Sequence, residues 1–299
     1  MSAAFKHATR LAQCSFALVL SVAMFGGAAN AGEKTLYSFA GGSADGAEPW
    51  GTLVADASGN LYGTTHVGGT GTQCGTGGCG TVFEIAPNGM ETILYNFAGG
   101  CDGAWPWAGV TLDKSSAIYG TTTAGGSCDG KGHGAVFKLA PDGTETVLYS
   151  FQSASDASIP YGNLVMDKSG NLYGTTLGGG TAGYGTVFKL AASGSETILH
   201  SFSRGTSDGF QPWAGLVMDK SGNLYGTTVY GGSNCDDPGC GTVFKLAPDG
   251  TETILHSFEG SDGELPYAGL LLGEKKMLYG TTVLGGANSE GVVFSLKTK

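Results

Sequence analysis

The sequence predicts an all-β protein, a five-bladed β-propeller built from four-stranded antiparallel blades. Three observations lead to this prediction. A segment that contains Tyr-Gly-Thr-Thr occurs five times, each copy holds four short strand-like runs, and helical periodicity is absent after the first 31 residues. Four antiparallel strands in roughly 40–50 residues form one propeller blade.

The repeat has a nearly constant length. The steps between successive copies of Tyr-Gly-Thr-Thr are 57, 54, 52 and 54 residues, and a proline precedes every copy with the same steps. The copies start at Tyr62, Tyr119, Tyr173, Tyr225 and Tyr279. A linear β-solenoid is the alternative architecture, but its usual coils are shorter and lack paired hairpins.

The fourth copy shows the four runs most clearly. We call them a, b, c and d, and they cover residues 215–219, 223–228, 241–246 and 251–258. The a–b link is Asp-Lys-Ser-Gly-Asn and the c–d link is Ala-Pro-Asp-Gly-Thr, both compositions of tight turns. The runs are rich in Val, Ile, Thr, Tyr and Phe, which is typical of strands. Gly226 and its two threonine neighbours are small enough for sheets to approach closely.

The two ends of the repeat array predict a closed ring. Residues 35–39 read as a run d without a, b or c before it, and residues 291–296 read as a run c without d after it. We therefore expect the N-terminal strand to complete the last blade. Closure would remove the exposed strand edges that an open array leaves.

Residues 1–31 are predicted to be a secretory signal peptide, which leaves residues 32–299 as a single propeller domain. Lys6 and Arg10 give a basic start, an apolar stretch follows, and Ala29-Asn30-Ala31 fits a cleavage site. The apolar stretch is too short to span a bilayer comfortably. We therefore expect a secreted protein, periplasmic or extracellular, without a membrane span.

The charge balance narrows the set of partners. Removal of the leader takes away two cations and no acid, so the net charge moves from −10 to −12. A strongly acidic chain argues against nucleic acid and anionic membranes, because binding to phosphate needs cations. We expect a monomer without cofactors.

The repeated sequence segments of the chain resemble those of a known protein family. Leu-Tyr-Gly-Thr-Thr, Gly-Gly and Gly-Thr-Val-Phe-Lys-Leu are similar to the Gloeo/Verruco (GloVer) tandem repeat of exported bacterial proteins, and the resemblance covers residues 34–296. The resemblance implies export. It implies no particular activity, because the family is defined by its repeat.

One face of the propeller is expected to carry function. In an up-and-down blade, the d–a and b–c loops emerge on one face, and the a–b and c–d turns on the other. The turns are short, whereas the loop face has long variable loops such as residues 67–80, 125–134 and 231–241. Binding residues tend to lie on variable loops over a rigid scaffold.

Six cysteines remain after the leader, and in an exported chain we expect them to pair. Cys74 and Cys79 lie in one b–c loop, and Cys235 and Cys240 lie in another, so each pair is expected to form a local disulfide. Cys101 lies in a d–a loop and Cys128 in a b–c loop of the same face, so they are the expected third pair. Zinc is the alternative ligand, but the pairs lie on separate blades and lack C-x₂-C spacing. We expect no metal site.

Each d–a loop carries an Asp and, after a proline, an aromatic residue. The Asp residues are Asp45, Asp102, Asp156, Asp208 and Asp262, and the aromatic residues are Trp50, Trp107, Tyr161, Trp213 and Tyr267. Aromatic faces suit sugar C–H surfaces and Asp suits hydroxyl groups, so we interpret both sets as ligand-binding. The alternative is that each Asp caps its own turn and each aromatic residue packs between blades. One Asp per blade does not supply the six or more oxygens that calcium takes.

The leading functional hypothesis is a non-catalytic binding module for carbohydrate or another surface polymer. The alternatives are a glycoside hydrolase or lyase with a site at the channel mouth, and a protein-interaction platform. His200 and His256 replace a repeated Tyr, His66 is interpreted as a solvated loop residue, and acid pairs such as Asp45 with Glu48 could serve a glycosidase. A catalyst needs residues unique to one or two blades, whereas the visible pattern repeats. No catalytic residue is therefore assigned.

Overall fold

The computed structural model describes residues 33–129, 132–152 and 156–298, so the predicted signal peptide and Cys14 lie outside the described residues. Residues Leu36–Lys299 form one compact unit. In the described part of this unit the regular structure is β-strand, with three short 3₁₀ turns: η1 (Gly42–Ala44), η2 (Gly75–Gly77) and η3 (Glu274–Lys276). Among the described residues, no helix has the length and apolar character needed to cross a membrane.

Each repeat forms one antiparallel sheet in which the strands are adjacent in chain order. The first sheet contains β2 (Val54–Ala55), β3 (Leu61–Thr65), β5 (Thr81–Ile85) and β6 (Glu91–Asn96). The second contains β7 (Thr111–Leu112), β8 (Ile118–Thr122), β9 (Ala135–Leu139) and β10 (Glu145–Ser150). The third contains β12 (Val165–Met166), β13 (Leu172–Thr176), β15 (Thr186–Leu190) and β16 (Glu196–Ser201). The fourth contains β18 (Val217–Met218), β19 (Leu224–Thr228), β21 (Thr242–Leu246) and β22 (Glu252–Ser257).

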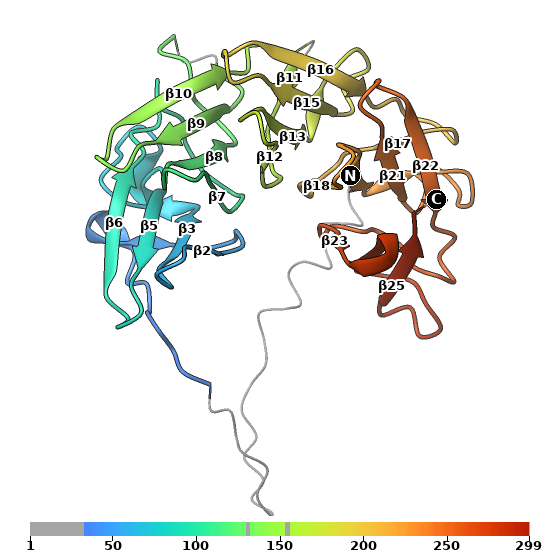
Figure 1. Ribbon diagram of the computed structural model, residues 1–299, viewed down its shortest axis with the longest axis horizontal. Helices are drawn as coiled ribbons and strands as arrows, with labels where there is room; N and C mark the ends of the chain where they lie inside the picture. Colours follow the sequence, from blue (N-terminus) through green and yellow to red (C-terminus); the bar gives the residue numbers. More distant parts are fainter. Residues whose placement is uncertain (1–32, 130–131, 153–155, 299) are drawn as a thin grey trace, which may run out of the picture. The chain divides into compact units, whose positions relative to one another are not determined.

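The fifth sheet has three strands, β23 (Leu271–Leu272), β24 (Met277–Thr282) and β25 (Val292–Lys297). The sheets follow one another in chain order, with the first strand of each toward the middle and the last strand outermost (Figure 1). These propeller-like sheets confirm the all-β prediction and the four-run repeat. The innermost strands are shorter than run a, since β18 has two residues where five were expected.

The outer edge of the fifth sheet is formed by β25, which pairs with β24. Residues 33–40 lie outside any strand, so the expected pairing of the N-terminal strand with β25 is not formed in this structure. The closed ring therefore stays a prediction.

Short additional pairings tie the d–a and b–c loops of each repeat together. They are β1 (Gly46–Ala47) with β4 (Val67–Gly68), β11 (Ala157–Ser158) with β14 (Gly178–Gly179), and β17 (Gly209–Phe210) with β20 (Tyr230–Gly231). In the second and fifth repeats, single bridges join Ala104 to Ala124 and Glu264 to Leu284. The two kinds of loop therefore lie side by side, as the up-and-down strand order predicts.

A carboxylate organises the a–b turn. Asp219 accepts hydrogen bonds from the backbone N–H of Ser221 (2.8 Å) and Asn223 (3.0 Å), and from the Tyr225 hydroxyl (3.0 Å). Gly222 completes the turn with a φ of 83°, a conformation that glycine adopts without steric cost. Asp56, Asp113 and Asp167 make the corresponding bonds, so the turn also fixes the Tyr of Tyr-Gly-Thr-Thr.

The Gly of Tyr-Gly-Thr-Thr lies opposite the Phe of the next strand in all five sheets. In the third sheet, Gly174 pairs in register with Phe188. A Cβ on Gly174 would lie 2.7 Å from the ring Cζ of Phe188 and 2.9 Å from Leu164 Cδ2. The glycine therefore makes room for a ring of its own sheet, and not, as the sequence suggested, for a neighbouring sheet.

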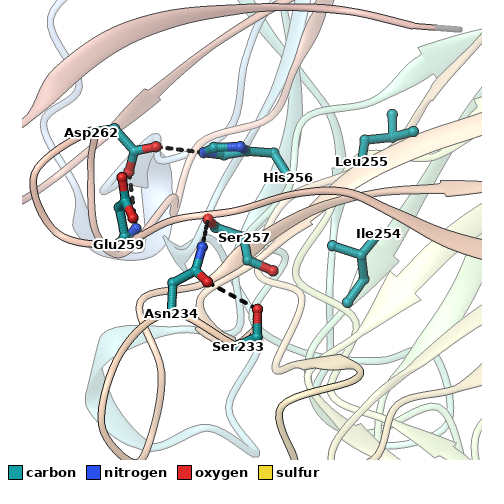
Figure 2. A pocket seen from close by; sticks show the side chains of 8 residues that line it. All are labelled: Ser233, Asn234, Ile254, Leu255, His256, Ser257, Glu259 and Asp262. Atoms are coloured by element: carbon teal, nitrogen blue, oxygen red, sulfur yellow. Dashed lines mark hydrogen bonds and ion pairs between the residues drawn. The ribbon is translucent and has the colours of Figure 1, made fainter.

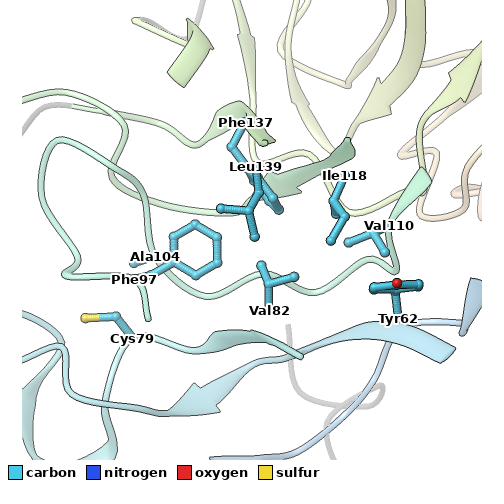
Figure 3. Packing of buried hydrophobic residues seen from close by; sticks show 9 residues of the cluster. All are labelled: Tyr62, Cys79, Val82, Phe97, Ala104, Val110, Ile118, Phe137 and Leu139. Carbon is cyan, nitrogen blue, oxygen red and sulfur yellow. The ribbon is translucent and has the colours of Figure 1, made fainter. Parts of the chain in front are cut away.

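Successive sheets bury a shared apolar core. Figure 3 shows the core between the first and second sheets, where Val82 and Phe97 meet Val110, Ile118 and Phe137. Edge-to-face Phe pairs recur at each sheet-to-sheet junction: Phe97–Phe137, Phe151–Phe188, Phe202–Phe244 and Phe258–Phe294, with centroids 5.1 to 5.3 Å apart. This is a favourable geometry for aromatic rings.

Candidate functional site

The loop face is cross-linked by all three expected disulfides. Cys74–Cys79 and Cys235–Cys240 each close a b–c loop, and Cys101–Cys128 joins a d–a loop to the b–c loop of the same repeat. Within the described ranges, no three His, Cys, Asp or Glu side chains gather in a way that could hold a metal ion.

The five aromatic residues of the d–a loops lie in one continuous series of ring contacts. Trp50 stacks on Trp107 with centroids 5.1 Å apart and planes 4° apart. Trp107 meets Tyr161 edge to face at 5.1 Å, Tyr161 lies 4.8 Å from Trp213, and Trp213 lies 5.2 Å from Tyr267. We call these five residues the aromatic mouth. It is the largest set of predicted site residues that the fold brings together.

The aromatic mouth lines a cavity of about 530 Å³. Most of the other lining residues are small residues that follow each ring and precede the innermost strands, and Asn163, Leu216, Val217 and Leu270 complete the lining. A Cβ on Gly51 would lie 2.3 Å from the backbone N of Gly109, and one on Gly162 would lie 2.5 Å from that of Gly215. Glycine is needed here because the backbones of adjacent innermost strands approach closely.

Asn163 adds a polar group to this cavity and has no copy in the other repeats. Its side-chain N–H donates to the Thr52 hydroxyl at 2.5 Å, and its carbonyl oxygen accepts from the Gly109 N–H at 2.8 Å. Asn163 therefore links the third repeat to the first and second repeats at this cavity.

Every d–a loop also holds the residue before its proline at positive φ. The φ angles lie between 55° and 59° at Glu48, Trp105, Ile159, Gln211 and Leu265. The carbonyl of this residue accepts from the first N–H after Tyr-Gly-Thr-Thr, as from His66 to Glu48 (3.0 Å) and from Val229 to Gln211 (3.2 Å). A backbone outlier held by repeated bonds is typical of loops that position functional groups. The backbone is the same in each repeat, whereas the side chain that it presents differs.

The five Asp residues are bound by their own loops. Asp102 accepts from the Tyr95 hydroxyl at 3.0 Å and from the Ala98 N–H at 2.7 Å. Asp45 and Asp156 accept from Tyr37 and Tyr149 in the same way. In the described part of the chain, the lining of the aromatic cavity includes none of the five Asp side chains. This arrangement favours the turn-capping interpretation for the Asp set.

His200 and His256 take the place of the repeated Tyr. The Nε2 atom of His200 lies 3.4 Å from Asp208, and that of His256 lies 2.8 Å from Asp262. Burial alone would raise the pKa of Asp208, but hydrogen bonds from His200 and Ser203 outweigh it and lower that pKa. The histidines thus serve the same loop contact as the tyrosines.

A second cavity, of about 360 Å³, lies beside the His256–Asp262 pair (Figure 2). It is lined by Ser233, Asn234, residues 254–257, Glu259 and Asp262. The Asp262 side chain is 37% exposed, compared with 10% for its counterpart Asp208, which lies near Glu252 of β22. The His256–Asp262 pair is therefore more open to solvent than the His200–Asp208 pair.

Sequence reasoning missed a polar and aromatic group beside Trp107. His66 is partly buried against the rings of Trp107 (4.9 Å) and Trp105 (6.3 Å), and its Nδ1 atom has no hydrogen-bond partner among the described residues. Burial lowers the pKa of His66, although Glu48 raises it in part. The interpretation of His66 as a solvated loop residue was wrong, because the fold packs it between two tryptophans that the repeat pattern did not connect with it.

The chain belongs to the Gloeobacter/Verrucomicrobia repeat family, whose model matches residues 24–236 and 193–299. Membership confirms the resemblance drawn from the repeated words. Among curated proteins, no match to the chain was found.

Several solved structures resemble the fold at low sequence identity. The gluconolactonase XC5397 of Xanthomonas campestris is 14% identical, with a TM-score of 0.48 over 84% of this chain and 77% of that protein. PorZ, a surface component of the type-IX secretion system of Porphyromonas gingivalis, is 18% identical, with a TM-score of 0.49 over 83% of this chain and 32% of that protein. The extracellular domain of BT4673 of B. thetaiotaomicron is 10% identical, with a TM-score of 0.49 over 81% of this chain and 26% of that protein.

Proposed function

We propose that this chain is an exported, non-catalytic carbohydrate-binding protein whose aromatic mouth contacts the ligand. One observation carries the proposal: aromatic residues from all five repeats meet in one series of contacts and line one cavity. Trp and Tyr combine a large apolar face with a polar tip, which suits a ligand that has both C–H surfaces and hydroxyl groups. The ligand class is a glycan or another surface polymer.

We infer that the scaffold is a closed five-bladed ring in the mature protein. The N-terminal segment already makes the contacts of an outermost strand, since Phe39 packs on Phe83 at 5.0 Å and Tyr37 donates to Asp45 at 3.0 Å. These contacts match Phe97 on Phe137 and Tyr95 on Asp102. Residues 36–39 would pair with the free edge of β25.

Exposed apolar side chains on the first and fifth sheets support this closure. Val293 is 82% exposed, whereas its four counterparts Val82, Val136, Val187 and Val243 are 0% exposed. Leu53 is 53% exposed, whereas its counterpart Val110 is 4% exposed. Val82 and Val110 share one core cluster, so Val293 and Leu53 are the two halves of the corresponding contact in a closed ring.

The disulfides support export, because stable disulfides are typical of oxidising compartments. A signal peptide at residues 1–31 with cleavage near Ala31 would supply the route. The binding module would act as a monomer.

The structure gives the enzyme alternative less support than the binding alternative. The His–Asp pairs occupy positions where other repeats have Tyr–Asp, so they follow the repeat instead of departing from it. The aromatic series, by contrast, gathers residues of every repeat at one place.

A glycan-array screen of the oxidised mature protein tests the proposal. A Trp107→Ala/Trp213→Ala variant is expected to lose binding at least tenfold, because buried aromatic anchors dominate such interfaces (roughly 2 kcal/mol or more each). Met90→Ala serves as the control, since Met90 is exposed in a c–d turn on the opposite face. The proposal is wrong if the folded double variant binds as well as the wild type, or if the wild type binds no glycan.

A further inference from the structure

The side chains next to the aromatic mouth differ between the repeats. Of the five side chains before the loop prolines, the only carboxylate is that of Glu48. Three of the four tryptophans of the chain, Trp50, Trp105 and Trp107, belong to the same first two repeats. We call Glu48 with these three tryptophans the acidic corner of the mouth.

The Glu48 carboxylate lies at the edge of the stacked tryptophans. The indole N–H of Trp50 donates to Glu48 Oε2 at 3.4 Å, and Trp50 stacks on Trp107. Glu48 is exposed, and within the described residues its side chain makes no other hydrogen bond. Trp50 is 59% exposed and Trp105 is 37% exposed, so aromatic surface and a free carboxylate oxygen face solvent together.

Among the described residues, Glu48 forms no ion pair with a Lys, Arg or His side chain. The lining of the aromatic cavity, which includes Trp50 and Trp107 but not Glu48, contains no Lys or Arg among the described residues, and burial lowers the pKa of the neighbouring His66, which favours its neutral form. The chain as a whole has a net charge of −10. An acidic surface with an unpaired carboxylate raises the local concentration of cations.

We propose that the acidic corner binds the protonated amino group of an amino sugar, so that the preferred glycan is a free-amine polymer such as oligoglucosamine. This inference rests on the proposed carbohydrate binding. The ammonium group would donate a charge-assisted hydrogen bond to Glu48, and the exposed tryptophan faces would attract the same cation. An N-acetylated sugar offers only a neutral amide to Glu48, and an acidic sugar would be repelled.

Isothermal titration calorimetry with two matched oligomers tests this inference. The oxidised mature protein is titrated at pH 6 with hexaglucosamine and with hexa-N-acetylglucosamine, because amines of this kind are largely protonated there. We expect hexaglucosamine to bind about fivefold more tightly, the size of a good exposed ion pair. The preference should shrink at high salt.

Glu48→Gln is the decisive variant, because Gln211 already occupies the equivalent position in the fourth repeat with the same backbone conformation. It should remove the preference for hexaglucosamine over hexa-N-acetylglucosamine. Glu290→Gln is the matched control, since Glu290 is an exposed acid in a b–c loop of the same face. It should keep the preference.

The outcomes separate this inference from the proposed function. Equal binding of both oligomers, or an unchanged preference in Glu48→Gln, overturns the inference and leaves the carbohydrate proposal standing. A loss of preference in Glu290→Gln as large as in Glu48→Gln would indicate general charge attraction, which also overturns it. If an oligolysine peptide binds through Glu48 while neither sugar oligomer binds, the partner is a basic protein and both proposals fail.

Discussion

At the scale of single residues, the repeated glycine of Tyr-Gly-Thr-Thr shows how one residue type determines side-chain packing within a sheet. Gly174 has a normal backbone conformation, so its φ angle does not explain the choice of glycine. The Phe188 ring covers it from the neighbouring strand. Glycine at this position is therefore a matter of space, and the same space is needed in every sheet.

We predict that Gly174→Ala destabilises the protein by about 1–3 kcal/mol, the usual cost of forcing extra atoms into a packed core. Chemical denaturation followed by near-UV circular dichroism would measure the change. Gly205→Ala is the control, because a Cβ there meets nothing within 4 Å. Equal stability of the two variants would contradict the packing explanation.

The sequence identifies a candidate site residue only where that residue recurs in the repeats. The five aromatic residues and the five Asp residues stand out because they recur. Glu48 and His66 do not recur, and their relation to Trp107 depends on how two loops distant in the sequence meet. The pattern also could not show that the Asp carboxylates bond within their own loops, because that depends on side-chain direction.

At the scale of elements, the N-terminal segment decides whether the ring closes. The repeat text predicts a strand at residues 35–39, and the contacts of Tyr37 and Phe39 agree with that position. Pairing with β25 is the step that the sequence alone cannot establish, because its partner lies about 250 residues away along the chain.

Hydrogen exchange on β25 tests closure. If residues 36–39 pair with it, β25 amides of the mature protein should exchange slowly, and a shortened chain that starts at Gly41 should exchange them at least tenfold faster. Phe39→Ala is the control, because it removes the contact with Phe83 and keeps the strand backbone. Fast exchange of β25 in the intact mature protein would contradict the closed ring.

At the scale of the whole molecule, equivalent Glu carboxyls in several repeats act together on the pH dependence of stability. Glu145, Glu196 and Glu252 begin the outermost strands of three sheets, and each has a buried Oε1 atom without a partner among the described residues. Burial, together with the Asp of the preceding d–a loop, raises their pKa to about 7. The second, third and fourth repeats thus each place a carboxyl that favours its neutral form at a sheet-to-sheet junction.

These carboxyls predict that stability falls as pH rises from 4.5 to about 7. In this window the folded chain holds protons that the unfolded chain, with ordinary Glu pKa values of 4.5, has released. The contribution of these carboxyls to the free energy of unfolding does not change with pH below pH 4.5 or above about pH 7. His66 works in the opposite direction, because its lowered pKa makes its own contribution rise with pH.

Thermal unfolding as a function of pH checks this prediction. A Glu145→Gln/Glu196→Gln/Glu252→Gln variant mimics the neutral acids, so it should unfold at a higher temperature than the wild type at pH 7.5 and show a flatter profile. Glu290→Gln should follow the wild type. A triple variant with the wild-type slope between pH 4.5 and 7 would contradict the assignment of the slope to these carboxyls.

The repeat predicted the blades because each one is a local unit of turns and strands, whereas the binding site depends on all the repeats at once. Intrinsic tryptophan fluorescence reports on that site directly, since all four tryptophans, Trp50, Trp105, Trp107 and Trp213, lie in the mouth or beside it. Titration of the oxidised mature protein with a glycan that binds on the array should give a saturable change in emission, with the dissociation constant measured by calorimetry. Calorimetric binding of that glycan without any change in emission would place the site elsewhere and contradict the central claim.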